Sequence, residues 1–121
     1  MSVLQNTKAR GDWAEERAAL YLEGMGYEIL VRNYRCPDGE IDIIALDSGT
    51  LVFVEVRARE NEVYGHPLET IGPQKIRRII RAAKHFIHDM GPVNRPTRFD
   101  AVGVLFGETM TFKLVKEAFE A

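Results

Sequence analysis

Two acidic residues interrupt strongly apolar stretches of the chain and are its clearest candidates for chemistry. Asp42 lies in the isoleucine-rich run 39–46, and Glu55 lies between two valines in the run 51–59. β-Branched residues on either side of a Ser-Gly turn predict the two strands of a hairpin. A carboxylate in a buried strand is costly unless it is paired or binds a cation. We therefore expect the hairpin to offer both carboxylates to a divalent metal ion, which prefers oxygen ligands from more than one element.

Arg57 adds a positive charge to this pair. It follows Glu55 by two residues, so the two side chains share one face of the strand, and Asp42 can reach that face from the neighbouring strand. A metal ion held by two carboxylates can activate water and neutralise charge on a phosphate. The alternative is structural, with Asp42 or Glu55 forming a salt bridge with Arg57 or Arg59. The two strands alone leave both interpretations open.

A helix is expected over residues 11–26 and would place a third carboxylate near the pair. Its apolar residues recur at helical spacing and predict a buried face, formed by Ala14, Ala18, Tyr21, Leu22 and Met25. Glu15 falls at the margin of this face, beside Ala19 and Leu22. It can therefore lean toward the sheet, whereas Glu16 and Glu23 point to solvent.

A second helix is expected over residues 73–90, between a proline at its first position and a Gly-Pro stop. Its predicted core stripe consists of Ile76, Ile79, Ile80, Ala83, Ile87 and Met90. Its outer face is basic and could follow a phosphate backbone through Arg77, Arg78, Arg81 and Lys84. The alternative is a solvated face with cations near the helix C-terminus. Lys75 lies on a flank, between the two faces.

The remaining segments complete an α/β pattern. Further strands are expected over 27–34, 98–106 and 109–115. Polar segments are expected as a flexible arm over 1–10, a mobile loop over 60–72 that contains His66, and a tail over 116–121. The order α-β-β-β-α-β-β predicts one domain over 1–121, with a mixed central sheet flanked by helices.

Composition limits the partners and the setting. The 121 residues carry a net charge of −2, so a nucleic-acid surface must come from an uneven distribution of charge. The one cysteine, Cys36, excludes a disulfide within the monomer and a thiolate zinc cluster, and it fits a reducing, cytoplasmic setting. We expect no membrane association, since no signal peptide is recognisable and no apolar run is long enough to span a bilayer.

Six segments together resemble the YraN-type family of small bacterial proteins, in the same order and over nearly the whole chain. They are Gly11-Asp12-Trp13-Ala14-Glu15, Gly39-Glu40-Ile41-Asp42-Ile43-Ile44, Val52-Phe53-Val54-Glu55-Val56-Arg57, Tyr64-Gly65-His66-Pro67, Lys75 and Arg98-Phe99-Asp100. That family is grouped with the PD-(D/E)XK nuclease superfamily and is similar to Holliday-junction resolvases. The resemblance implies a restriction-endonuclease-like fold and a metal-dependent DNA endonuclease, with branched or damaged DNA as candidate substrates. It also implies a homodimer, by analogy with resolvases that cut symmetrically.

The resemblance also assigns roles to individual residues. It implies a Mg²⁺ or Mn²⁺ site made by Glu15 from the helix and by Asp42 and Glu55 from two strands. The superfamily's catalytic lysine stands two residues after the second acid, where this chain has Arg57. Arginine can hold a phosphate or a transition-state charge, but it cannot be deprotonated. Lys75 could substitute if the second helix packs beside the site.

The departure at Arg57 keeps a second class of function open. The chain could be a catalytically inactive module with a nuclease-like fold that binds nucleic acid or a protein partner. In that case the carboxylates would be structural. Metal binding distinguishes the two classes.

Overall fold

The computed structural model describes residues 7–60, 71–90 and 94–121, with side chains from residue 11 onward. The expected order α-β-β-β-α-β-β is confirmed. The elements are α1 (Thr7–Gly24), β1 (Glu28–Cys36), β2 (Gly39–Asp47), β3 (Thr50–Arg59), α2 (Pro73–Met90), β4 (Thr97–Leu105) and β5 (Thr111–Phe119).

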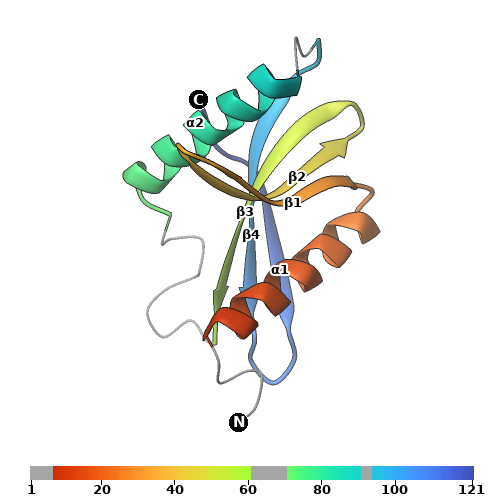
Figure 1. Cartoon of the computed structure of the whole chain (residues 1–121). Coiled ribbons are helices and arrows are strands. Elements are labelled where there is room, and N and C mark those ends of the chain that lie inside the picture. The colour runs from red at the N-terminus through yellow and green to blue at the C-terminus, as the bar shows by residue number, and fades with distance from the viewer. Residues whose placement is uncertain (1–6, 61–70, 91–93) are drawn as a thin grey trace.

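The five strands form one mixed sheet in the order β1-β2-β3-β4-β5 (Figure 1). Neighbouring strands are antiparallel except for β3 and β4, which run parallel from the Leu51–Thr97 pair to the Arg59–Leu105 pair. A parallel pair needs a crossover connection, and the chain between β3 and β4 contains α2. The mixed sheet predicted from the sequence is thus confirmed.

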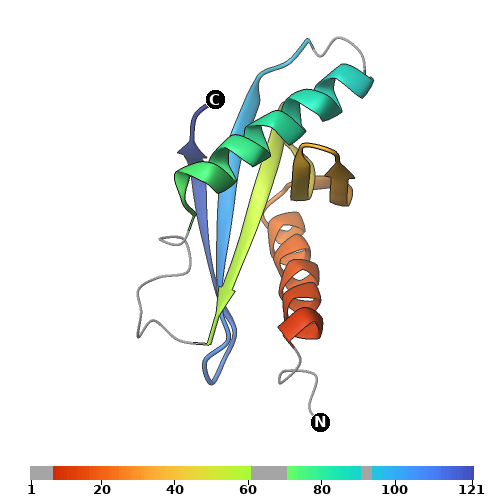
Figure 2. The same ribbon diagram turned by 60° about the vertical axis from the view of Figure 1, so that its left-hand side comes forward.

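Each helix covers one side of the sheet, and the alternation of side chains along β3 divides the core in two. Val52 and Val54 pack with α1, whereas Leu51 and Phe53 pack with α2. The two helices are seen on different sides of the strands when the molecule is turned (Figure 2). The result is a three-layer α/β arrangement in which the site residues of β3 can face α2.

Several predicted boundaries were wrong. α1 begins at Thr7, so residues 7–10 are helical and do not belong to a loose arm. β5 continues to Phe119, because Phe119 still pairs with Phe99 of β4, so most of the expected tail is strand. The rest of the predicted arm, and residues 61–70 of the predicted loop with His66, lie outside the described residues.

The two predicted core stripes need correction at their C-terminal ends. Met25 and Met90 were expected to be buried, but their exposed fractions are 52% and 62%. Met25 follows the last residue of α1 and Met90 is the last residue of α2, so neither is held against the sheet. Ala82 and Phe86 are buried instead, and the Phe86 ring packs edge-on against Phe53. No helix in the described part of the chain is long and apolar enough to cross a membrane.

Candidate metal and nucleic-acid site

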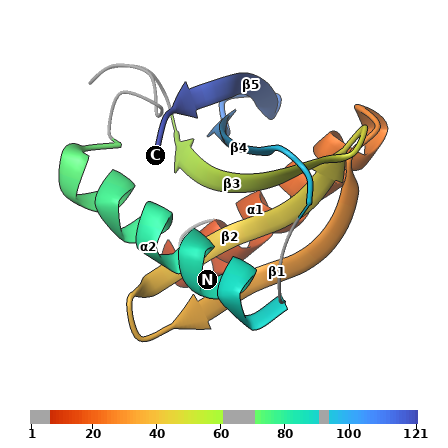
Figure 3. The same ribbon diagram turned by 90° about the horizontal axis from the view of Figure 1, so that it is seen from above.

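Asp42 lies where β2 separates from β3. The β2–β3 register runs from the turn to the Ile43–Val54 pair and goes no further, while β3 stays paired with β4 to Arg59. Just beyond that last pair, Asp42 Oδ2 accepts the Val56 N–H at 2.8 Å. The carboxylate takes the place of a backbone acceptor and is thereby fixed beside β3. The curvature of the β1–β2 hairpin away from the other strands is visible from above (Figure 3).

Glu55 is the neighbouring acid and is only 5% exposed. Burial, and next a hydrogen bond with the Asp42 side chain and the Asp42 charge, raise the pKa of Glu55 to about 9, while Lys75 and Arg57 oppose the shift. Two carboxyl groups can share a hydrogen bond only if one holds a proton. Glu55 Oε2 has no hydrogen-bond partner in the described structure. The Asp42–Glu55 pair therefore favours binding of a proton or of another cation.

Glu15, on α1, lies close enough to Asp42 to feel its charge. Burial, and next the Asp42 charge, raise the pKa of Glu15 to about 7, while Arg32 opposes the shift. Glu15 Oε1 is buried, and no described group donates a hydrogen bond to it. Glu15 is therefore coupled to Asp42 through charge, whereas Asp42 and Glu55 are in contact.

The three acids have the ligand chemistry that Mg²⁺ or Mn²⁺ requires, but their side chains are not yet close enough to bind one ion together. Carboxylate oxygens are the ligands that these ions prefer, and Glu15 and Glu55 each keep one buried oxygen without a hydrogen-bond donor. Over residues 7–60, 71–90 and 94–121, however, no three His, Cys, Asp or Glu side chains form a ready ligand cluster. Glu15 would therefore have to move closer to complete a site with the Asp42–Glu55 pair.

Lys75 is brought to the site, as the sequence predicted on the condition that the second helix packs there. Its Nζ lies 3.5 Å from Glu55 Oε2. Buried Ile79, one turn later, anchors α2 on the sheet. Gly39 at the start of β2 also meets the helix closely, since a Cβ at Gly39 would come within 3.3 Å of the Arg78 carbonyl oxygen. These contacts hold the lysine beside the acids.

The four basic residues predicted on the outer face of α2 are all exposed, namely Arg77, Arg78, Arg81 and Lys84. The same helix carries Lys75 on the side that meets the sheet. α2 therefore offers positive charge to solvent along its length and positive charge to the acidic pair near its N-terminus.

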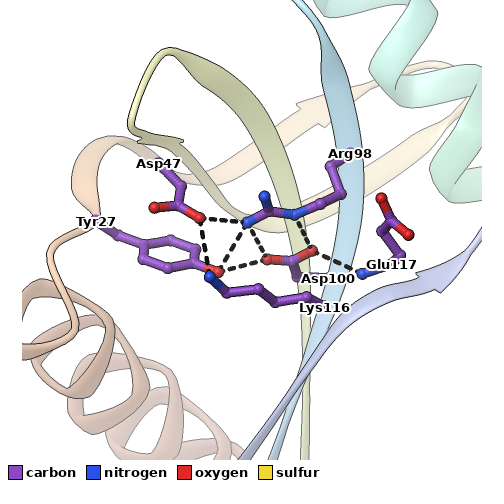
Figure 4. A network of polar contacts seen from close by, with 6 residues as sticks. All are labelled: Tyr27, Asp47, Arg98, Asp100, Lys116 and Glu117. Atoms are coloured by element: carbon purple, nitrogen blue, oxygen red, sulfur yellow. Dashed lines mark hydrogen bonds and ion pairs between the residues drawn. The ribbon is translucent and has the colours of Figure 1, made fainter.

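A second polar cluster was missed by sequence reasoning and lies at the start of β4 (Figure 4). Asp100 is fully buried and accepts hydrogen bonds from the Tyr27 hydroxyl at 2.6 Å and from Arg98 Nε at 2.8 Å. A second Arg98 nitrogen lies 2.7 Å from Asp47 Oδ2, and the Glu117 N–H donates to Asp100 at 3.1 Å. Asp100 thus accepts hydrogen bonds from Tyr27, from Arg98 and from the Glu117 backbone.

The chemistry of this cluster is structural. Hydrogen bonds from Arg98, and with them the nearby Lys116, hold the pKa of Asp47 below its usual range. The buried carboxylate of Asp100 is satisfied by hydrogen bonds on both oxygens. One feature of the sequence could have revealed this cluster. Arg98 and Asp100 are charged residues in an apolar strand, and because they are two residues apart they lie on one face of it. Sequence reasoning used these residues only as part of a family motif.

Comparison with known proteins gives one consistent result. A family model described as "Uncharacterised protein family UPF0102" matches residues 14–104. A UPF0102 protein of Lachnoclostridium phytofermentans is 48% identical over 117 residues, covering 96% of this chain and 97% of that protein. One from Desulfosudis oleivorans is 43% identical and covers 98% of this chain and 96% of its own length. One from Clostridium acetobutylicum is 38% identical, with 93% and 95% covered.

Proposed function

The chain belongs to the uncharacterised protein family UPF0102, and from this membership together with the acidic centre we propose that it is a divalent-metal-dependent DNA endonuclease. The family's grouping with PD-(D/E)XK nucleases supports the reaction class. The observation that carries the proposal is the contact between Asp42 and Glu55, with Lys75 3.5 Å from the second acid. Branched or damaged DNA is the proposed substrate.

Each residue has a role in this proposal. Glu15, Asp42 and Glu55 would hold Mg²⁺ or Mn²⁺, which when bound supplies Lewis-acid polarisation of the phosphate and lowers the pKa of water. Asp42 is kept in position by the Val56 N–H. Lys75 and Arg57 place positive charge where a phosphate gains negative charge in the transition state.

The basic outer face of α2 would bind the phosphates that flank the reacting one. Such contacts position the nucleic acid without reading its sequence. Symmetric cleavage of a junction requires two active sites, so the proposal includes a homodimer. Sedimentation of the protein with and without four-way-junction DNA tests this part.

The main test is a cleavage assay with labelled duplex, single-stranded and four-way-junction DNA, in Mg²⁺, Mn²⁺ or EDTA. Cleavage should require the metal ion and should be lost in Asp42→Asn. Lys75→Met should reduce cleavage while Lys84→Met, on the solvent face of the same helix, should retain it. If no substrate is cut by the wild type above the Asp42→Asn background, the nuclease proposal fails.

A catalytically inactive binding module is the second candidate, and one observation favours it. Both acids have partners within the protein, since Asp42 accepts the Val56 N–H and Glu55 pairs with Lys75. The arginine at position 57, where the nucleases have lysine, points the same way. Calorimetry that finds no heat of Mn²⁺ binding, together with DNA binding indifferent to chelator, would favour this candidate.

A further inference from the structure

A small apolar hollow adjoins the acidic pair. Its volume is about 160 Å³, and it is lined by Ile71, Ile76, Ala101, Val115, Ala118 and Phe119. In the sheet, Glu55 pairs with Ala101 and Ala101 pairs with Val115, so these three residues form a row across β3, β4 and β5. On the helix, Ile76 directly follows Lys75. The hollow therefore lies beside Glu55 in the sheet and beside Lys75 on α2.

The side chains of β4 become smaller along the face that carries the site. Phe99 lies beside Phe53, Ala101 beside Glu55, and Gly103 beside Arg57. α2 packs over β2 and β1, and the small side chain of Ala101 forms part of the wall of the hollow. The decrease in bulk thus begins where the acidic pair begins, and space remains next to the catalytic candidates.

We propose that this hollow receives the base of an unpaired nucleotide next to the phosphate held at the Asp42–Glu55 pair. This rests on the proposed function and specifies its substrate. An apolar cavity of about 150 Å³ holds one benzene ring, so a hollow of about 160 Å³ suits one ring of a base. The Phe119 ring stacks on Phe99 with 5.1 Å between the ring centroids, and Phe119 also forms an aromatic wall of the hollow.

The charges around the hollow agree with a nucleotide. The side chains that line it are all apolar, as the face of a base requires, and Lys75, next to Ile76 in the chain, lies 3.5 Å from Glu55, where the phosphate would lie. A base in an intact duplex would first have to unstack and unpair, at a cost of a few kcal/mol. Single-stranded, frayed or branched DNA avoids much of that cost, so such DNA should be preferred.

A second copy of the chain is a weaker occupant for this hollow. Stable protein interfaces bury upward of about 1,000 Å². Six lining residues around a space of this volume offer only a fraction of that area. A single planar ring uses the space fully.

The test uses Ala118→Leu in the full chain, because Ala118 is exposed at the rim and the change adds bulk without disturbing the core. Affinity is measured for a fluorescent single-stranded oligonucleotide and for the matching duplex, in EDTA and in Mn²⁺. Stacking of one base contributes about 1–3 kcal/mol, so single-strand affinity should fall about 5- to 150-fold. Duplex affinity should stay the same, and Thr111→Leu at the other end of β5 should change neither.

A measurement on the wild type needs no variant. Methyl resonances of Val115 and Ala118 should shift on addition of the single-stranded oligonucleotide and stay in place with the duplex. Equal single-strand affinity of Ala118→Leu and wild type would overturn the inference. So would a change in sedimentation mass caused by Ala118→Leu, since the hollow would then be a subunit contact.

The outcomes also separate this inference from the proposed function. Cleavage by the wild type with unchanged binding by Ala118→Leu would leave the nuclease standing and remove the base pocket. Absence of cleavage with selective weakening of single-strand binding in Ala118→Leu would remove the nuclease and keep the base pocket.

Discussion

Glu55 is buried beside the partly exposed Asp42, and two charged carboxylates so close together need a cation near them. Lys75 partly supplies that cation at 3.5 Å from Glu55. The rest is supplied by a proton, because burial and the Asp42 side chain raise the pKa of Glu55 to about 9. If a divalent ion bound to the two carboxylates, this proton would be released to solvent, since metal ligands must be deprotonated.

Glu55→Gln should change how stability depends on pH. With a pKa near 4.5 when unfolded and about 9 when folded, Glu55 contributes stability below the lower value, and this is lost as the pH rises through the higher one. In EDTA, the wild-type free energy of unfolding should fall relative to Glu55→Gln by at most about 1.4 kcal/mol per pH unit. Urea unfolding between these two pKa values measures the effect.

Glu16→Gln is the matched control for this experiment, because Glu16 is exposed on α1. It should follow the wild-type pH dependence. If the Glu55→Gln and wild-type stability curves run parallel, Glu55 ionises like an ordinary surface acid and the strong coupling with Asp42 is absent.

For individual residues, the sequence identified the acidic residues of the site better than it identified the residues that contact them. Asp42 and Glu55 stood out because charge in a β-branched run has to be explained. The Lys75 ion pair could only be stated conditionally, since it depends on how α2 packs. The Asp100 network depends on Tyr27 and Asp47, which are more than fifty residues away in the chain. No local pattern encodes such contacts.

Among the elements, the buried Asp100 links β4 to Tyr27, the residue before β1, and to β5. Asp100→Ala would remove the acceptor shared by Tyr27 and Arg98 and leave the guanidinium partly unpaired in the interior. Breaking a buried charge pair costs about 3–5 kcal/mol, so we expect a decrease of that size in the free energy of unfolding. Chemical denaturation measures it, and Asp38→Ala in the exposed β1–β2 turn should cost little. A decrease below about 1 kcal/mol would show that the network is dispensable.

α2 has two faces with separable roles. Arg78→Ala combined with Arg81→Ala should weaken DNA binding for all sequences and flatten the slope of log affinity against log salt by about 0.9 for each phosphate that the protein no longer neutralises. Stability should change little, because both side chains are exposed. Titration of fluorescent duplex at several salt concentrations provides the measurement.

Two controls make the arginine experiment specific. Arg17→Ala combined with Lys113→Ala removes the same charge from exposed sites on α1 and β5, and the salt slope should be retained. Asp42→Asn should lower metal affinity and keep the slope. An unchanged affinity and slope in the Arg78/Arg81 variant would place the DNA surface elsewhere.

The boundaries of elements were predictable where the chain carries strong stop signals. α2 runs from Pro73 to Met90 as expected, because a proline opens it and Gly-Pro follows it. α1 starts earlier than expected, since Thr7 to Arg10 contain no breaker. β5 continues through Lys116 and Glu117, which look like a polar tail because an edge strand exposes many of its side chains to water.

For the whole molecule, the order of elements fixed the class of fold but left the pairing open. The parallel β3–β4 register, and hence the row from Glu55 to Ala101, follows from the crossover through α2. The hollow beside the site follows from where α2 lies on the sheet. Both are properties of the packed chain, so the sequence predicted the acidic residues without predicting the space next to them.

A metal ion that binds only the folded protein must raise its stability by mass action. At a free concentration of a hundred times Kd, the gain is about 2.7 kcal/mol. For a chain of this length 1 kcal/mol corresponds to roughly 4 °C, so saturating Mn²⁺ should raise the Tm of EDTA-treated wild type by about 10 °C. Asp42→Asn, which replaces the anchored carboxylate with an amide, should lose most of the increase.

Thermal unfolding with and without Mn²⁺ therefore reports on the site without any assay of activity. Asp38→Asn, exposed in the turn before β2, should keep the full increase in Tm, and so should Lys75→Met, because removing the competing ammonium group leaves all three carboxylates in place. An equal Mn²⁺ effect on wild type and Asp42→Asn would mean that the ion binds elsewhere. No effect on either protein would leave the Asp42–Glu55 pair as a protonated structural contact, as in the binding-module candidate.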